Sequence, residues 1–206
     1  MKHLVLPLLL TLATPASAAE PLDIPGSFRS DSSGNLPPGV RASGTVIRAI
    51  SWTDSKGDNL AVFSASAKSK TRGETTILSK TLFVDVFTGK NGKLRKARTV
   101  KEVLNNCEFD LTNEFLDTSV GVTDLDGDGL GELAFAYRTS CRSDVSPAQM
   151  KLLILEGPHK HILRGTTRVR PGGGETFGGD FSPDFKGAPQ AFLDHAAKLW
   201  GKFVDE

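Results

Sequence analysis

The chain has 206 residues, of which 24% are charged and 38% hydrophobic, and its formal net charge is +1 at pH 7. This length allows one sizeable globular domain or two small ones. The near-neutral charge argues against a nucleic-acid partner, because proteins that bind nucleic acids usually carry an excess of clustered basic charge. After the N-terminal residues, no apolar run reaches the roughly 20 residues that a transmembrane helix needs, so we expect no transmembrane span in the mature chain.

The first 18 residues have the pattern of a secretory signal peptide. A short basic start at Lys2 and His3 precedes an apolar run over residues 4–12, and Ala16-Ser17-Ala18 forms a small-residue cleavage site. An uncleaved anchor is the alternative, although the apolar run is short for a membrane span. We therefore expect a periplasmic or secreted protein that is formally neutral once Lys2 is removed.

The mature chain contains one pair of cysteines, Cys107 and Cys141. In an exported protein, a lone pair most simply forms one structural disulfide. A redox-active pair is the alternative, but it usually has a Cys-x-x-Cys spacing, which is missing here.

Residues 19–43 are rich in proline, serine and glycine and are expected to form an extended lead-in segment. From Gly44, runs of β-forming residues alternate with turn sequences. The expected strands of this first part are residues 45–52, 60–67, 82–87 and 93–98. Thr99 and Glu102 then have capping-box spacing with apolar residues on one helical face, which predicts a short helix from Thr99 to about Cys107.

A later segment repeats an earlier one. Residues 53–60 align with residues 123–130 at an offset of 70 positions, with identical Thr, Asp, Gly, Asp and Leu. We interpret this as two related units, residues 44–105 and 114–170, each an antiparallel meander of about four strands. Chance similarity between two hairpins is the alternative.

The second unit has alternating apolar residues, the period of a strand, after its turn. Its expected strands are residues 118–122, 133–138, 150–155 and 162–169, followed by a glycine-rich excursion over residues 171–179. Apolar residues then recur at helical spacing over residues 189–203. The predicted fold is mainly β: two related, propeller-blade-like antiparallel units in one β domain over residues 44–206, arranged as an open sheet or a sandwich, with a C-terminal helix.

The turn of the second unit concentrates acidic side chains. Asp124, Asp126 and Asp128 occupy alternate positions, and Glu132 follows three residues after Gly129. So many hard oxygen ligands suit Ca²⁺, and the glycines permit a tight turn around an ion. An EF-hand is disfavoured, because Phe135 stands where that loop requires a bidentate glutamate. An acidic surface turn without metal is the alternative.

The stretch from Val122 to Leu133 resembles the calcium-binding hairpins of FG-GAP repeats, known from integrin α-chain propellers, which read Asp-x-Asp-x-Asp-Gly-x-x-Asp between two strands. The resemblance implies side-chain ligation by Asp124, Asp126, Asp128 and Glu132, and ligation by the carbonyl of Leu130. Glu132 departs from the usual aspartate. The wider stretch from Cys107 to Cys141 also resembles a poorly characterised group of exported bacterial proteins, some labelled with surface polysaccharide biosynthesis. In the earlier copy Lys56 replaces Asp126, so we expect that loop to lack a metal.

No catalytic motif is apparent: the sequence contains no Gly-x-Ser-x-Gly elbow, phosphate loop or dinucleotide fingerprint. A histidine pair, several acids near the loop and a basic run are weaker candidates for sites: His159 and His161; Asp110, Glu114, Asp117 and Asp144; Lys90, Lys93, Arg95, Lys96, Arg98 and Lys101. We expect a monomeric, calcium-stabilised binding or scaffolding protein of the bacterial envelope, with a glycan or protein partner. A glycan hydrolase that uses acids near the loop, or a structural domain without a ligand, are the alternatives.

Overall fold

The computed structural model describes residues 27–28 and 36–206. The expected signal peptide, residues 1–18, and most of the lead-in segment lie outside the described residues. The described chain is mainly β, with antiparallel sheets and one C-terminal α-helix, α1 (Gln190–Phe203), as expected from the sequence. None of the helices in these ranges is both long and apolar enough to cross a membrane.

The first sheet is an antiparallel meander in which chain order and spatial order agree. It consists of β1 (Ser27–Phe28), β2 (Thr45–Asp54), β3 (Gly57–Arg72), β4 (Thr75–Lys90) and β5 (Lys93–Cys107). The helix predicted from Thr99 is wrong, because β5 continues to Cys107. Val100 lies opposite Val84 and Leu104 opposite Lys80, so pairing with β4 overrides the local helical signal.

The second sheet has the order β13-β10-β9-β8-β6, with β7 paired to the other end of β8. Its strands are β6 (Asp110–Phe115), β7 (Gly121–Thr123), β8 (Glu132–Arg142), β9 (Gln149–Glu156), β10 (His159–Thr166) and β13 (Phe181–Asp184). A short 3-10 turn, η1 (Asp117–Ser119), occupies the start of the strand predicted over residues 118–122. The glycine-rich excursion contributes to a small hairpin of β11 (Arg168–Gly172) and β12 (Glu175–Gly178).

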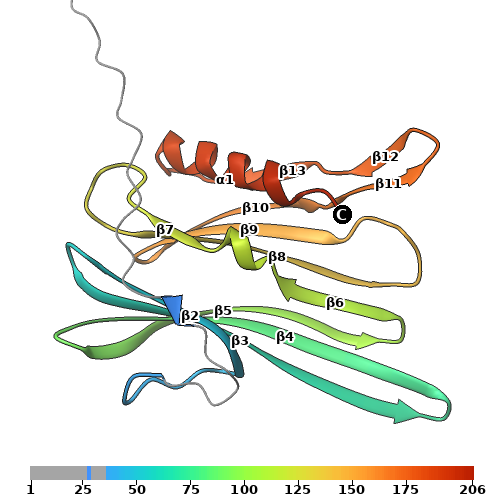
Figure 1. Cartoon of the computed structure of the whole chain (residues 1–206), viewed down its shortest axis with the longest axis horizontal. Helices are drawn as coiled ribbons and strands as arrows, with labels where there is room; N and C mark the ends of the chain where they lie inside the picture. Colours follow the sequence, from blue (N-terminus) through green and yellow to red (C-terminus); the bar gives the residue numbers. More distant parts are fainter. Residues whose placement is uncertain (1–26, 29–35) are drawn as a thin grey trace, which may run out of the picture.

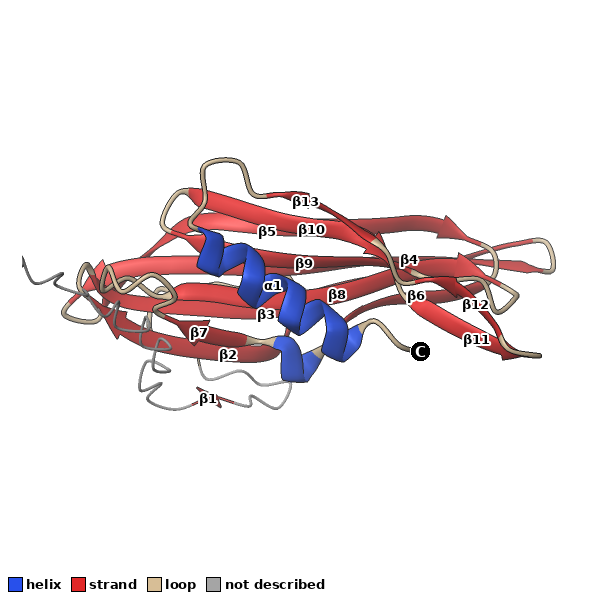
Figure 2. Ribbon diagram, turned by 90° about the horizontal axis from the view of Figure 1, so that it is seen from above, coloured by secondary structure: helices blue, strands red, loops and turns tan. Residues whose placement is uncertain are grey.

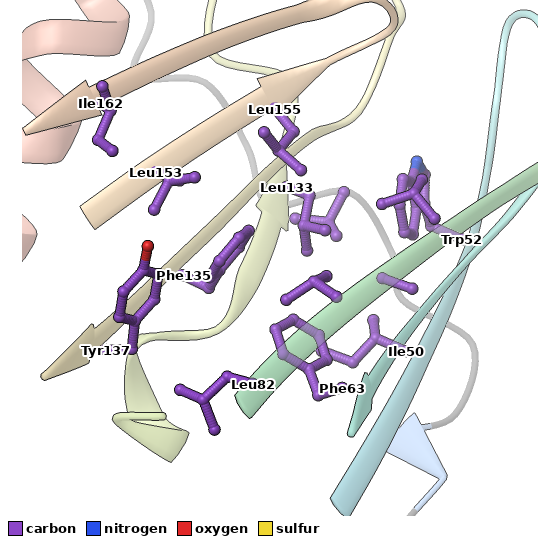
Figure 3. Packing of buried hydrophobic residues seen from close by; sticks show 14 residues of the cluster. Ile50, Trp52, Phe63, Leu82, Leu133, Phe135, Tyr137, Leu153, Leu155 and Ile162 are labelled. Atoms are coloured by element: carbon purple, nitrogen blue, oxygen red, sulfur yellow. The ribbon is translucent and has the colours of Figure 1, made fainter. Parts of the chain in front are cut away.

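The two main sheets pack face to face as a sandwich, and α1 covers the outer face of the second sheet (Figures 1 and 2). Strand alternation explains both layers of core: Leu133, Phe135 and Tyr137 of β8 face the first sheet, whereas Ala134 and Ala136 face α1. Figure 3 shows the inter-sheet core, where side chains from both sheets point toward one another.

The described end of the lead-in segment covers part of the first sheet's outer face. Leu36, Val40 and Ala42 pack against a cluster that includes Val62 and Phe87. The adjoining Ser43 is anchored on the fully buried carboxylate of Asp85: its N–H donates at 2.7 Å and its hydroxyl at 2.9 Å.

Asp85 also accepts hydrogen bonds from the Thr99 hydroxyl at 2.5 Å and from the Lys96 ammonium at 2.9 Å. Burial alone would raise the pKa of this carboxyl, but the bonds from Thr99, Lys96 and Ser43 outweigh burial and hold the pKa below its usual value. The carboxylate therefore ties the lead-in segment to β4 and β5.

We predict that Asp85→Ala lowers the free energy of unfolding by about 2–3 kcal/mol at pH 7, because Ser43, Lys96 and Thr99 lose their hydrogen bonds to a buried, charged acceptor. The folded-state pKa is lowered, so this stabilisation is complete above the unfolded-state pKa of about 3.9 and is lost as the pH falls through the folded-state pKa. Urea unfolding at a series of pH values measures both effects. Glu74→Ala, an exposed carboxylate at the β3–β4 turn, is the control; an equal loss in both variants would contradict the prediction.

Cys107 and Cys141 form a disulfide with a Cα–Cα distance of 5.6 Å, as predicted. The bridge links the end of β5 in the first sheet to β8 in the second. A disulfide is compatible with an oxidising compartment outside the cytoplasm.

Candidate metal centre

The three aspartates lie in the connection between β7 and β8, at one end of the sandwich, and Glu132 begins β8. The turns β2–β3, β4–β5 and β9–β10 gather at the same end, on the left of Figure 1. The two segments that align in the sequence, residues 53–60 and 123–130, are thus both turns at this end. Their common origin stays a prediction.

Asp124, Asp126, Asp128 and Glu132 converge, since one carboxylate oxygen from each lies within 4.8 Å of the other three. Glu132 is the first residue of β8 and pairs with Thr123 of β7, so the β7–β8 ladder fixes both ends of the segment. All four side chains that the sequence predicted as ligands therefore meet at one point. The cluster could hold a metal ion.

The three aspartates are oriented by hydrogen bonds from the backbone of their own loop. Asp124 accepts from the N–H groups of Gly127 at 2.8 Å and Gly129 at 2.9 Å. Asp126 accepts from the N–H of Asp128 at 3.3 Å, and Asp128 accepts from the N–H of Leu130 at 2.8 Å. Gly127 and Gly129 have φ values of 77° and 81°, which side chains with a Cβ rarely adopt. The glycines therefore permit the turn that brings the carboxylates together.

Glu132 differs from the aspartates in being fully buried, with 0% of the residue exposed. Its Oε2 accepts from the N–H of Leu125 at 2.6 Å, whereas its Oε1 has no hydrogen-bond partner within the described part of the chain. Burial raises the pKa of Glu132 to about 8; the Leu125 N–H opposes this rise, and the charges of Asp126, Asp124 and Glu156 add to it. A buried, unpartnered carboxylate oxygen beside three carboxylates is the environment that a cation would stabilise.

The acidic loop is docked on the first sheet. The Gly129 carbonyl accepts from the N–H of Ser55 at 2.9 Å, and the Gly131 N–H approaches Oδ2 of Asp54 at 3.4 Å. A Cβ on Gly131 would lie 2.5 Å from Nε1 of Trp52, so glycine is required for this close contact. The position of the loop therefore depends on both sheets.

In the earlier copy, protein donors surround the aspartate that aligns with Asp124. Oδ1 of Asp54 accepts from the N–H of Lys56 at 2.9 Å and of Gly57 at 3.2 Å. Oδ2 accepts from the side chains of Asn59 at 2.9 Å and Trp52 at 3.3 Å. This aspartate therefore stabilises a turn and supports the neighbouring acidic loop.

Glu156, at the end of β9, is a further carboxylate near the cluster that the sequence did not reveal. Its pKa is raised first by burial and then by the charges of Asp128 and Asp126, while His159 and Lys56 lower it. Its proximity follows from the pairing of β9 with β8, in which Leu155 lies opposite Leu133. No local motif marks such a residue.

Two of the weaker acidic candidates and the histidine pair occupy ordinary structural environments. Glu114 pairs with Arg138 at 2.7 Å, and Asp144 accepts from the N–H of Ser146 at 2.9 Å in an exposed turn. His159 and His161 do share a face of β10, with ring centroids 6.4 Å apart, but the His161 ring packs against Phe185 and Phe192.

Comparison with protein-family models, with curated proteins and with solved structures finds no match to this chain. The resemblance of residues 122–133 to FG-GAP hairpins, and ligation by the Leu130 carbonyl, therefore stay predictions. The acidic cluster itself follows directly from the geometry.

Proposed function

We propose that this protein is an exported, calcium-stabilised binding protein of the bacterial envelope. The observation that carries the proposal is the buried Oε1 of Glu132, which lacks a hydrogen-bond donor in the described chain and belongs to a cluster of four carboxylates. Leaving a carboxylate buried and unpaired is costly unless a cation compensates it. The disulfide supports a location outside the cytoplasm.

The donor set favours calcium over softer metals. The four converging side chains offer only carboxylate oxygens, with no imidazole or thiolate in the cluster. Such ligands suit Ca²⁺, which accepts about 6–8 oxygens in flexible geometry, whereas Mg²⁺ demands a near-ideal octahedron. The glycine-containing loop between β7 and β8 suits Ca²⁺, whose coordination geometry is the more flexible of the two.

The role that we assign to the ion is to fix one end of the sandwich. Without a cation, the three aspartates repel one another and the raised pKa of about 8 keeps Glu132 largely protonated at pH 7. With a cation, all four groups can bind as carboxylates and hold the loop against Ser55 and Asp54 of the first sheet. An ion that binds only the folded state stabilises it by about 2.7 kcal/mol at a concentration one hundred times its Kd. For a Kd on the order of 10⁻⁴–10⁻³ M, as in extracellular calcium modules, calcium at about 10 mM would thus stabilise the fold by about 1.4–2.7 kcal/mol.

We predict that calcium raises the melting temperature of the mature protein and that Asp126→Ala abolishes this rise. Asp126 is exposed and central in the cluster, so its removal takes away a ligand without opening a core cavity. Thermal melts with excess calcium, with excess magnesium and with chelator measure the effect. The matched control is Glu74→Ala, which removes one exposed carboxylate at the far β3–β4 turn and is expected to retain the full calcium response. Equal melting temperatures of the parent with calcium and with chelator would refute the proposal.

A further inference from the structure

A pocket of about 650 Å³ lies beside the acidic loop, at the same end of the sandwich. Its walls come from both sheets and from the turns that join their strands, and they include Leu130 and Gly131 of the acidic loop. The volume falls within the roughly 300–1,000 Å³ of small-molecule sites. The inner part of the pocket is apolar and is lined by Trp52, Val86, Leu133 and Leu155. Figure 3 shows Trp52, Leu133 and Leu155 at this end of the inter-sheet core.

Cationic side chains surround this apolar part. The lining contains five of them, Lys56, Lys90, Lys93, Arg95 and Arg98, against two carboxylates. Both carboxylates are engaged by the protein: Asp54 by the donors described above, and Asp58 by the N–H of Gly92 at 2.9 Å. Lys90, Lys93 and Arg95 form no ion pair with any residue in the described ranges. The lining of the pocket therefore has an excess of positive charge, of which Lys56 also faces Glu156 beside the acidic loop, whereas Lys90, Lys93 and Arg95 face no carboxylate partner among the described ion pairs.

Strand register explains why the cations point into the space between the sheets. Val84 and Val86 of β4 face the inter-sheet core, and alternation places Thr88 and Lys90 on the same face. Cross-strand partners share a face, so Arg98 opposite Val86, Arg95 opposite Thr88 and Lys93 opposite Lys90 also point inward. Toward this end of the sandwich, the inner face thus changes from apolar to cationic.

We infer that the pocket binds an anionic amphiphile, with its apolar body against Trp52 and Leu155 and its carboxylate or phosphate headgroup among Lys93, Arg95 and Arg98. Charge complementarity and the apolar lining together select this class: a simple anion would not use the apolar wall, and a neutral lipid would not use the cations. The inference deepens the proposed function, on which it rests, by assigning a ligand class to the binding protein.

The test uses two fluorescent probes that share one aromatic body, anilinonaphthalene sulfonate, which is anionic, and N-phenylnaphthylamine, which is neutral. We expect the mature protein to bind the anionic probe at one saturable site and at least about tenfold more tightly than the neutral probe. Decanoate and decyl phosphate should each displace it, and their relative potency identifies the headgroup. Equal affinity for both probes, or displacement only by inorganic phosphate or a sulfated oligosaccharide, would overturn the inference.

Variants locate the site. Lys93→Glu with Arg95→Glu should weaken binding of the anionic probe by at least about tenfold, because two favourable charges become repulsive. Lys68→Glu with Lys70→Glu makes the same charge change on the exposed far part of β3 and should leave the affinity unchanged. Thr88→Trp, at an exposed position that lines the pocket, fills it without a charge change and should also weaken binding. Similar losses in the first two variants, or none with Thr88→Trp, would overturn the assignment.

Repeating the titration in calcium and in chelator separates this inference from the calcium role. If probe binding depends on Lys93 and Arg95 but calcium does not change the melting temperature, only the calcium role is refuted. A calcium-stabilised protein without selectivity for the anionic probe would refute only the ligand class.

Discussion

Replacement of both Cys107 and Cys141 by serine is expected to lower the free energy of unfolding by about 4 kcal/mol. The bridge spans 34 residues of sequence, and the chain-entropy estimate for a loop of this size is about 3.8 kcal/mol at 25 °C. The expected effect is large because the bridge closes the segment that contains the β5–β6 connection, the acidic loop and most of β8. Urea unfolding of the parent and the double variant, both in chelator, measures the difference.

The same experiment repeated in calcium provides the control. The disulfide restricts mainly the unfolded chain, whereas the proposed ion binds the folded loop, so calcium should add a similar free-energy increment to both proteins. A difference below about 1 kcal/mol between parent and double variant in chelator would contradict the predicted role of the bridge.

Phe63→Ala is expected to lower the free energy of unfolding by about 3–5 kcal/mol, the range for truncating a buried phenylalanine. Phe63 is 1% exposed, and its ring lies edge-on to Phe115 at 5.1 Å and to Phe135 at 5.5 Å between centroids. These contacts join β3 of the first sheet to β6 and β8 of the second. The truncation would therefore leave a cavity between the two layers.

Phe109→Ala is the matched control, because Phe109 is 57% exposed in the connection between β5 and β6. Its truncation should change the free energy of unfolding by no more than about 0.5 kcal/mol. Chemical denaturation of the parent and both variants provides the comparison. Similar losses in the two variants would show that the aromatic cluster does not hold the sheets together.

The mainly β fold could be predicted because its signals are local. In β8, Leu133, Phe135 and Tyr137 alternate with small residues, and in α1 the buried Phe192, Ala196 and Trp200 recur at helical spacing. The far halves of β3 and β4 gave no such signal: the paired stretch from Lys68 opposite Ser79 to Arg72 opposite Thr75 is mostly polar. Hairpin pairing extends these strands beyond the apolar runs from which they were predicted.

The candidate site was predictable only in part, because only some of its features arise from residues that are close in the sequence. The three aspartates and Glu132 lie within nine residues, 124–132, so their convergence is visible in the sequence. Other features depend on contacts between different strands. They are the burial of Glu132, the proximity of Glu156 to the cluster, and the docking of Gly131 on Trp52. The cationic lining of the pocket likewise depends on which face of β5 each basic residue occupies, and a bulge between Arg98 and Lys96 determines this face.

The two tryptophans occupy different layers of the molecule. Trp52 belongs to the cluster between the sheets, whereas Trp200 belongs to the cluster beneath α1 and donates from Nε1 to the Gly179 carbonyl at 3.0 Å. Because the chain has only these two tryptophans, replacing either one with phenylalanine leaves a single indole emitter. The order in which the helix and the sandwich come apart can therefore be read from native emission spectra, without any attached dye.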